Sequence, residues 1–182
     1  MAQHSQALDL EEALRTIRDR LSSPITHETC PIADSLGRAV AAPVTAALSL
    51  PPFTASAMDG YAVRSADLNA NAGYSLQRIG TSLAGHPFNG SVRHGQCVRI
   101  FTGAALPEGA DLVVVQENVT HEDAGQVSFI PHTSKDTNVR AIGNDIAAGQ
   151  VLVDTGETIN PFLLGHLAAA GVTELSVFTK VR

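Results

Sequence analysis

The chain has 182 residues, which is enough for one domain or two small ones with a buried core. Its formal net charge of −6 gives no general attraction for nucleic acid or an anionic membrane, so we expect neither as a partner. Hydrophobic residues make up 44% of the sequence, which indicates a folded globule. Residues 1–7 are polar and lead into no long apolar run, so we expect a cytoplasmic protein without signal peptide or membrane span.

The two cysteines, Cys30 and Cys97, form no CxxC pair. Two isolated thiols suit a reducing cytoplasm, and a single disulfide is the open alternative. No two of the seven histidines have the spacing of a zinc-binding helix, and the sequence has neither a P-loop nor a GxGxxG motif. We therefore expect neither a transition-metal site nor a nucleotide-phosphate loop.

Residues 9–21 predict one amphipathic helix, capped by Asp9 with Glu12 three residues later. Its apolar residues repeat at helical spacing: Leu10, Leu14, Ile17 and Leu21. Such a stripe is either a partner-binding surface or the face that packs on the helix's own chain. We favour packing on its own chain. Ser-Ser-Pro at residues 22–24 ends the helix.

The middle of the chain predicts short strands. After a strand-like piece at residues 24–30 and a helical turn near residues 33–36, residues 40–48 are expected to be extended. Further strands are predicted at residues 61–64, 74–79, 97–101, 112–116 and 126–130. Glycine and proline separate them, and no βαβ alternation occurs. The pattern indicates a compact, mostly β domain rather than a Rossmann-like core.

The last part of the chain predicts one more helix between strands. A strand is expected at residues 151–153, and Asn160-Pro161 supplies a helix start. The helix should be short and largely buried because leucine and alanine dominate it, and residues 172–178 form a last strand. The predicted fold class is mainly β with a few short helices, a complex β or α+β fold.

Residues 50–63 combine a rigid frame with polar side chains. They read Leu50-Pro51-Pro52-Phe53-Thr54-Ala55-Ser56-Ala57-Met58-Asp59-Gly60-Tyr61-Ala62-Val63. The prolines fix φ and remove backbone donors, and the Asp-Gly pair favours a turn before a strand. A lone Asp-Gly is typical of an ordinary turn. Here Thr54, Ser56 and Asp59 add two hydroxyls and a carboxylate, which favours a binding loop.

This stretch resembles the signature of the molybdopterin molybdenumtransferases, the MoeA and gephyrin E-domain family, which reads Pro-x-Phe-x-x-Ser-x-Met-Asp-Gly-Tyr-Ala-Val. Later segments also resemble the family: Val98-Arg99-Ile100-Phe101-Thr102-Gly103-Ala104 with Leu106-Pro107-Glu108-Gly109-Ala110-Asp111, Val139-Arg140 with Gly143-Asn144-Asp145-Ile146, and Gly165 to Gly171. The resemblance covers nearly the whole chain.

The resemblance implies a β-rich domain at residues 51–139, inserted into an elongated domain that residues 23–50 and 140–182 form together. Residues 1–22 would be a tail and the first helix. Family members continue into a molybdopterin-binding α/β domain and a C-terminal β domain. We expect both to be absent here, so that the chain is an N-terminal portion, either an excised piece or a truncated gene product.

The resemblance also implies a function. The full-length protein would be a homodimeric, cytoplasmic transferase that inserts molybdate into adenylylated molybdopterin, releases AMP and requires Mg²⁺. Molybdopterin adenylyltransferase would be the upstream partner. The active site of the full-length transferase would combine the absent α/β domain of one subunit with the β-rich domain of the other. This segment alone should therefore be inactive. The alternative is a non-catalytic scaffold or dimerisation module that keeps the fold.

Site residues follow from the same resemblance. Asp59 and Thr102 are the expected catalytic residues, and no metal ligand is assigned. The expected substrate-binding residues are Ser56, Met58, Gly60, Gly103 and Asp145. From the residues alone, Thr102 would be a turn residue that bonds a nearby backbone group. Asp59 either orients the substrate by hydrogen bonding or holds Mg²⁺ through water, because Mg²⁺ takes few carboxylates and several waters.

Overall fold

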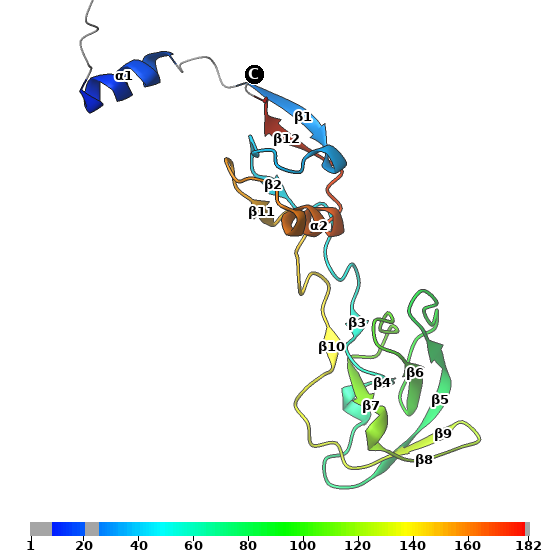
Figure 1. Cartoon of the computed structure of the whole chain (residues 1–182). Coiled ribbons are helices and arrows are strands. Elements are labelled where there is room, and N and C mark those ends of the chain that lie inside the picture. Colours follow the sequence, from blue (N-terminus) through cyan, green and yellow to red (C-terminus); the bar gives the residue numbers. More distant parts are fainter. Residues whose placement is uncertain (1–8, 21–25, 181–182) are drawn as a thin grey trace, which may run out of the picture. The chain divides into compact units, whose positions relative to one another are not determined.

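The computed structural model describes residues 9–20 and 26–180, which form mainly β structure with two α-helices (Figure 1). This confirms the predicted fold class. The predicted end of the first helix and start of the next strand, at residues 21–25, lie outside the described residues. The helices are α1 (Leu10–Arg20) and α2 (Pro161–Ala169). Within the described ranges, no helix has the length and apolar character needed to cross a membrane.

A six-stranded sheet dominates the middle of the chain and curls on itself (Figure 1). In sheet order its strands are β7 (Leu112–Val115), β4 (Gly60–Val63), β6 (Gln96–Ile100), β5 (Tyr74–Ser82), β9 (Gln126–Phe129) and β8 (Val119–Asp123). Only β5 and β6 pair in parallel. Five of these strands were predicted. The sequence did not reveal β8, because it is an edge strand whose last four residues are exposed and polar.

The remaining strands form two-stranded sheets between distant segments. The pairs are β1 (His27–Pro31) with β12 (Glu174–Phe178), β2 (Val44–Thr45) with β11 (Val151–Val153), and β3 (Ala55–Ser56) with β10 (Val139–Arg140). Single 3₁₀ turns lie at Ile32–Asp34, Ser65–Asp67 and Gln116–Asn118. Each pairing joins residues that are more than 80 positions apart, so these sheets depend on the whole chain.

Contacts divide the chain into two compact units. One contains Leu152–Ala168 with the described parts of Met1–Val44 and Val172–Arg182. The other contains Thr45–Val151 and Ala169–Gly171. The domain boundaries expected near residues 50 and 140 stay a prediction.

Both faces of the six-stranded sheet are covered by apolar side chains. One face carries Tyr61, Val63, Leu76, Cys97, Leu112, Val114, Val127 and Phe129. The other carries Ala62, Val92, Val98, Ile100, Ala104 and Val113. Neighbouring residues of β4, β6 and β7 therefore alternate between two cores, as the two-residue period of a strand requires. This explains why Leu112–Val115 is apolar throughout.

The first unit has its own core and the second helix. Its buried residues are Cys30, Val40, Val44, Val153, Ile159, Leu167, Val172, Leu175 and Val177. Asn160 caps α2 as predicted, because its Oδ1 accepts a hydrogen bond from the Leu163 amide at 2.9 Å. The prediction that this helix is largely buried is wrong. Within α2 only Leu167 is buried, and Phe162 is 90% exposed, because one face of the helix meets the core while apolar residues occur on every face.

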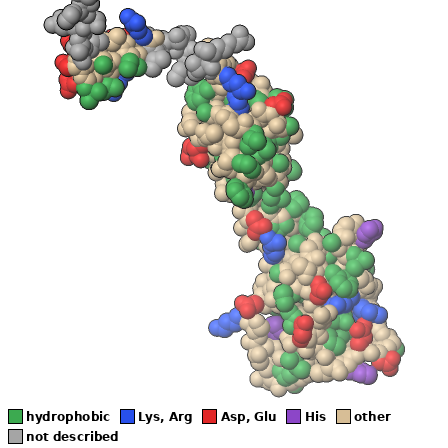
Figure 2. All heavy atoms as spheres, viewed as in Figure 1, with side chains coloured by type: hydrophobic (Ala, Val, Ile, Leu, Met, Phe, Trp, Pro, Cys, Tyr) green, Lys and Arg blue, Asp and Glu red, His purple; other side chains and the backbone are tan. Residues whose placement is uncertain are grey.

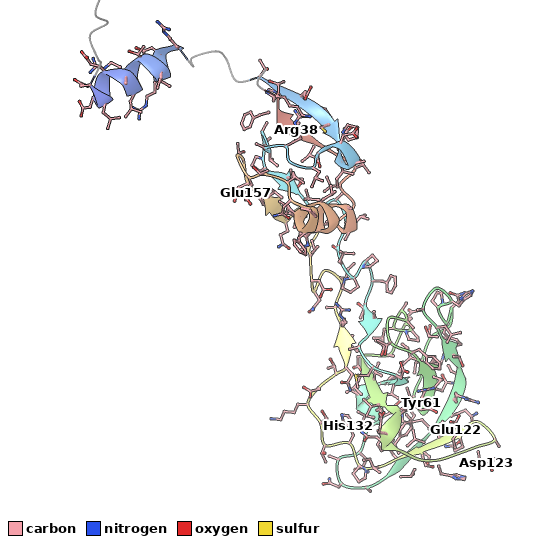
Figure 3. All side chains as sticks on the ribbon, in the orientation of Figure 1. Arg38, Tyr61, Glu122, Asp123, His132 and Glu157 are labelled. Atoms are coloured by element: carbon pink, nitrogen blue, oxygen red, sulfur yellow. The ribbon has the colours of Figure 1, made fainter. Side chains whose placement is uncertain are left out.

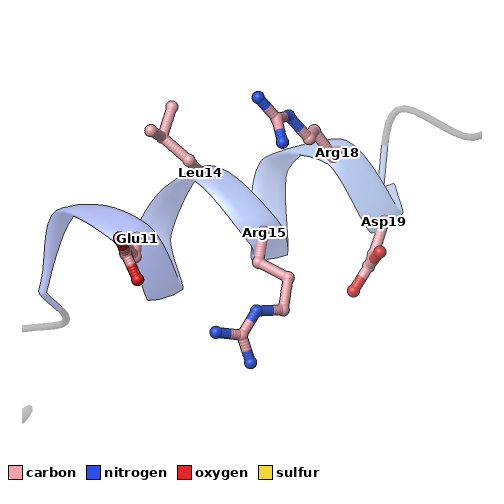
Figure 4. Close-up of a pocket in the computed structure, with 5 residues that line it drawn as sticks. All are labelled: Glu11, Leu14, Arg15, Arg18 and Asp19. Carbon is pink, nitrogen blue, oxygen red and sulfur yellow. The ribbon is translucent and has the colours of Figure 1, made fainter.

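Helix α1 begins as predicted, with the Glu12 amide donating to Asp9 Oδ1 at 2.8 Å. The structure does not support the prediction that its apolar stripe packs on its own chain. No residue of α1 is buried, and Leu10, Leu14 and Ile17 are 75%, 44% and 52% exposed. Around a shallow hollow on this helix, Leu14 and Arg18 project from one side and Arg15 and Asp19 from the other (Figure 4).

Gly60 lies in the interior strand β4, where a Cβ atom would come within 2.1 Å of the Val114 carbonyl oxygen. We expect Gly60→Ala to destabilise the six-stranded unit by about 3 kcal/mol, because backbone atoms of β7 would have to move. Gly165→Ala in α2 is the matched control, since no atom lies within 4 Å of its added methyl group. Alanine is also about 1 kcal/mol more favourable than glycine in a helix interior, so this variant should not be destabilised. Amide hydrogen exchange reports each unit separately. Normal protection of β4 in Gly60→Ala would show that β7 accommodates the methyl group, contrary to this expectation.

Candidate functional site

Asp59 and Thr102 lie together at one end of the six-stranded sheet. Asp59 precedes β4 and Thr102 follows β6, and these strands pair antiparallel with Gly60 opposite Ile100. The Asp59 carboxylate accepts two hydrogen bonds at Oδ1, from the Thr102 amide at 2.8 Å and from the Thr102 hydroxyl at 2.7 Å. The structure thus brings the two predicted catalytic residues into direct contact.

Backbone hydrogen bonds fasten the loops that carry this pair. The Ser56 amide donates to the Ala104 carbonyl, and the Gly103 amide donates to the Ser56 carbonyl, both at 2.9 Å. The Leu106 amide donates to the Thr54 carbonyl at the same distance. The two segments that resemble family signatures are therefore one structural unit, and its geometry is set mainly by the main chain.

Ser56 has an internal role in the structure. It is 1% exposed, and its hydroxyl donates to the Met58 carbonyl at 2.5 Å and accepts from the Met58 amide at 3.3 Å. These bonds close the turn before Asp59. Met58 itself is 44% exposed on the same loop. Substrate binding by either residue stays a prediction.

The two predicted glycines serve the backbone in different ways. Gly60 allows β4 to approach β7 more closely than any side chain permits. Gly103 has a φ of +80°, a conformation that other residues rarely adopt, and it directly follows Thr102. Both support the position of the Asp59–Thr102 pair, and their contact with substrate stays a prediction.

Asp145 belongs to a separate cluster. Its carboxylate forms an ion pair with Arg140 and accepts a hydrogen bond from Asn144 at 3.4 Å. The hydrogen bond from Arg140 is the main cause that lowers the pKa of Asp145, and Asn144 adds to it. The described contacts of Asp145 include neither Asp59 nor Thr102, so its predicted substrate-binding role stays untested.

An apolar hollow of about 300 Å³ borders the same loops. Its lining residues are Phe53, Leu83, Gly85, Pro87 and Ala105. Exposed apolar side chains also appear on the surface of this unit (Figure 2), and they include Phe53, Met58 and Leu83. The segments that carry Asp59 and Thr102 therefore also carry apolar surface, at Phe53, Met58 and Ala105.

Arg99 is the residue of this site that the sequence did not single out. Its Nη1 donates to the Gly60 carbonyl at 2.9 Å and its Nη2 donates to Gln116 Oε1 at 2.6 Å. Its guanidinium lies over the rings of Tyr61 and Phe101, at 5.2 and 4.5 Å from their centroids. In the sequence, an arginine between Val98 and Ile100 has the pattern of a solvent-facing strand residue. The available signal was its place within the second signature, two residues before Phe101.

Hydrogen bonds and charge keep Asp59 ionised. The backbone hydrogen bond from Thr102 is the largest cause that lowers its pKa, the Thr102 hydroxyl is the second, and the charge of Arg99 acts in the same direction. Among the described residues, hydrogen bonds reach this carboxylate only at Oδ1. Oδ2 remains for a ligand or a hydrated cation.

The donor set around Asp59 fits a cation held mostly by water. Within the described part of the chain, no three His, Cys, Asp or Glu side chains come together in a way that could hold a metal ion. Mg²⁺ does not need such a cluster, because it commonly binds through one or two carboxylates, substrate phosphates and several waters. Asp59 Oδ2 suits that role, and no other carboxylate of the described residues joins it here.

Cys97 is not a candidate nucleophile. Its side chain is fully buried in the sheet, and burial raises the pKa of its thiol to about 12, with Glu122 adding to the effect. The thiol therefore stays protonated near neutral pH and packs as an apolar residue. Both Cys97 and Cys30 are free thiols.

Thr102→Val should raise the pKa of Asp59, because it removes the hydroxyl donor and keeps the amide donor. A lowered folded pKa stabilises the protein above the unfolded value of about 3.8, and that stabilisation is lost as pH falls through the folded pKa. Wild type and variant should therefore differ in stability near neutral pH and converge in acid. Carboxyl ¹³C NMR measures the titration directly. Asp145 is the internal control, and an equal shift at both carboxylates would contradict a local effect.

Residues 8–171 match the model of a protein family described as the MoeA N-terminal region (domain I and II). The chain is 34% identical over 175 residues to a molybdopterin molybdenumtransferase of Haemophilus influenzae, an alignment that covers 96% of this chain and 43% of that protein. It is also 34% identical over 149 residues to a molybdopterin molybdenumtransferase of a Nostoc species, covering 80% and 34%. The chain thus spans less than half the length of these relatives.

Solved structures show the same similarity. A crystal structure of the molybdopterin biosynthesis MoeA protein from Pyrococcus horikoshii superposes with a TM-score of 0.84 and 31% identity, covering 96% of this chain and 45% of that one. A second crystal structure of that protein gives a TM-score of 0.78, with 26% identity and coverage of 92% and 45%.

Proposed function

Because the chain belongs to the MoeA N-terminal region family and is similar to molybdopterin molybdenumtransferases, we propose that it is the N-terminal portion of such an enzyme. The complete protein would insert molybdate into adenylylated molybdopterin and release AMP. It would act in the cytoplasm as a homodimer, downstream of a molybdopterin adenylyltransferase. Since the chain spans 43% of the Haemophilus influenzae relative, the whole reaction is proposed only for a protein that contains the rest.

The single observation that carries this proposal is the contact between Asp59 and Thr102. It joins the two signature segments into one site with an ionised carboxylate whose Oδ2 is not hydrogen-bonded by any described residue. An isolated carboxylate repels phosphate and molybdate, so it must act on a hydrogen-bond donor of the substrate or on a cation. Thr102 holds its orientation while it does so.

Mg²⁺ would partly neutralise the phosphate charge of the substrate when bound. Asp59 is the residue of this chain that would hold it, through water, and Thr102 would keep the carboxylate in place. The basic groups that bind the anionic substrates would come mainly from the part of the relatives that this chain does not span. Ser56, Met58, Gly60, Gly103 and Asp145 are proposed to shape or contact the substrate side of the loops.

A second candidate function is a non-catalytic scaffold or dimerisation module. The observation that favours it is the apolar surface outside the Asp59 site, which includes Leu10 and Ile17 of α1 and Phe162 of α2. The two candidates differ in what the gene encodes after residue 182. A reading frame that continues into an α/β domain supports the enzyme, and a stop codon supports the module.

Asp59→Asn in the complete protein should lower turnover at least about tenfold, because a lost transition-state interaction of about 1.4 kcal/mol has that effect. Melting should change little, since Asn keeps the size, the turn preference and the Oδ1 acceptor. Thr102→Ala should act more mildly, through loss of one neutral hydrogen bond of about 1 kcal/mol. Asp123→Asn at the end of β8 is the matched charge control. Full molybdenum insertion by Asp59→Asn would reduce the loop to an architectural role.

The 182-residue chain alone should bind adenylylated molybdopterin only weakly. The only described cation that acts on Asp59 is Arg99, whereas the ligand carries several negative charges. Isothermal titration calorimetry with the purified chain measures this. A dissociation constant of about 1 μM or lower, equivalent to about −8 kcal/mol, would show that this segment carries the main binding site.

A further inference from the structure

The dipeptide Asp59-Gly60 is held at three points by residues of β6 and of the segments that follow β6 and β7. Thr102 binds the Asp59 carboxylate, the Gln116 amide donates to the Asp59 carbonyl at 3.1 Å, and Arg99 Nη1 donates to the Gly60 carbonyl at 2.9 Å. Arg99 Nη2 also donates to the Gln116 side chain at 2.6 Å. Two successive carbonyl groups are thereby fixed by one arginine and the glutamine that it binds. The direction in which the Asp59 side chain points therefore depends on both Arg99 and Gln116.

Arg99 is itself fixed by its surroundings. It lies directly opposite Tyr61 in the antiparallel register of β4 and β6, so both side chains are on the same face of the sheet. Tyr61 is 4% exposed, donates to Glu122 Oε2 at 2.7 Å and packs edge-to-face on Phe129 with centroids 5.4 Å apart. Figure 3 shows Tyr61 and Glu122 in this unit. The guanidinium thus lies over the Tyr61 ring, which burial and the contacts with Glu122 and Phe129 hold in place.

This arrangement needs an arginine. The flat guanidinium presents two Nη groups in one plane, which reach the Gly60 carbonyl and Gln116 together while its face lies on the rings of Tyr61 and Phe101. A lysine would keep the charge, but its single ammonium group has neither the flat face nor the fixed fork. An Arg99→Lys variant therefore distinguishes the charge of Arg99 from the geometry of its guanidinium group.

We infer that Arg99 is a positioning residue for Asp59: its two hydrogen bonds and its stacking on Tyr61 and Phe101 fix the Asp59-Gly60 backbone, and so the carboxylate that acts on the substrate. Thr102 fixes the same carboxylate directly, through hydrogen bonds from its amide and its hydroxyl to Asp59 Oδ1. The effect on turnover rests on the proposed function. The effect on the geometry and titration of Asp59 does not.

The test compares Arg99→Gln and Arg99→Lys with Arg93→Gln, a control that removes an exposed charge just before β6. NMR of the 182-residue chain follows the Asp59 carboxyl titration and the Thr102 amide proton. We expect Arg99→Gln to raise the pKa of Asp59 and to shift the Thr102 amide resonance. Arg99→Lys should return the pKa of Asp59 part of the way to the wild-type value and the Thr102 amide resonance less, because lysine restores the charge without the paired Nη donors. Arg93→Gln should change neither.

The complete protein supplies the second measurement. Arg99→Gln should lower kcat about tenfold and leave KM within about threefold, because the residue acts through Asp59 rather than on the substrate. Arg99→Lys should fall between Arg99→Gln and wild type. A raised KM with unchanged kcat would overturn the inference in favour of direct substrate binding. If Arg99→Gln fails to fold, Gln116→Ala replaces it, since it removes the side-chain acceptor that fixes Arg99 Nη2 and leaves the bond from the Gln116 amide to the Asp59 carbonyl in place.

The outcomes keep the two proposals apart. An unchanged Asp59 titration and Thr102 amide in folded Arg99→Gln would overturn the positioning role, whatever the enzyme assays show. If both NMR signals move while Asp59→Asn keeps full activity, the proposed catalytic role of Asp59 fails and the positioning of Asp59 by Arg99 is upheld.

Discussion

The antiparallel pairing of β4 with β6 is the constraint on which the candidate site depends. Because Gly60 lies opposite Ile100, the residues just before β4 and just after β6 emerge at the same end of the sheet. That register brings Asp59 and Thr102 into hydrogen-bond contact. A slip of one residue would turn every side chain of the strand to the other face, and apolar cores on both faces prevent it. Sheet packing therefore determines the site.

The site combines an acidic chain with one ionised carboxylate and one nearby arginine. The chain has a formal net charge of −6, so only local groups can compensate a negative ligand. Asp59 is kept ionised by two donors from Thr102 and by the nearby charge of Arg99. Such a carboxylate is useful where it meets a donor or a hydrated cation. The proposed role of this segment is therefore to orient the substrate or a hydrated cation rather than to capture an anion.

Local chemistry in the sequence determined much of the secondary structure and the site's composition. Asp9 and Asn160 cap helices because short polar side chains accept from free amides at a helix start, and this needs no distant residue. Short strand-like runs separated by glycine and proline indicated five of the six strands of the main sheet. The Asp-Gly pair itself predicted the turn at Asp59-Gly60, whereas the catalytic roles expected for Asp59 and Thr102 came only from the family resemblance and stay predictions.

Tertiary structure decided what each polar side chain does. Ser56 has its hydroxyl turned into its own loop, and Arg99 has its charge turned toward Gly60 and two aromatic rings. The orientation of Arg99 does not follow from the sequence, because Gly60 and Tyr61 belong to a strand that only the fold brings beside β6. The exposure of Phe162 on α2 is likewise a matter of packing, since hydrophobicity shows which residues favour burial and only the neighbouring elements decide how much surface they cover.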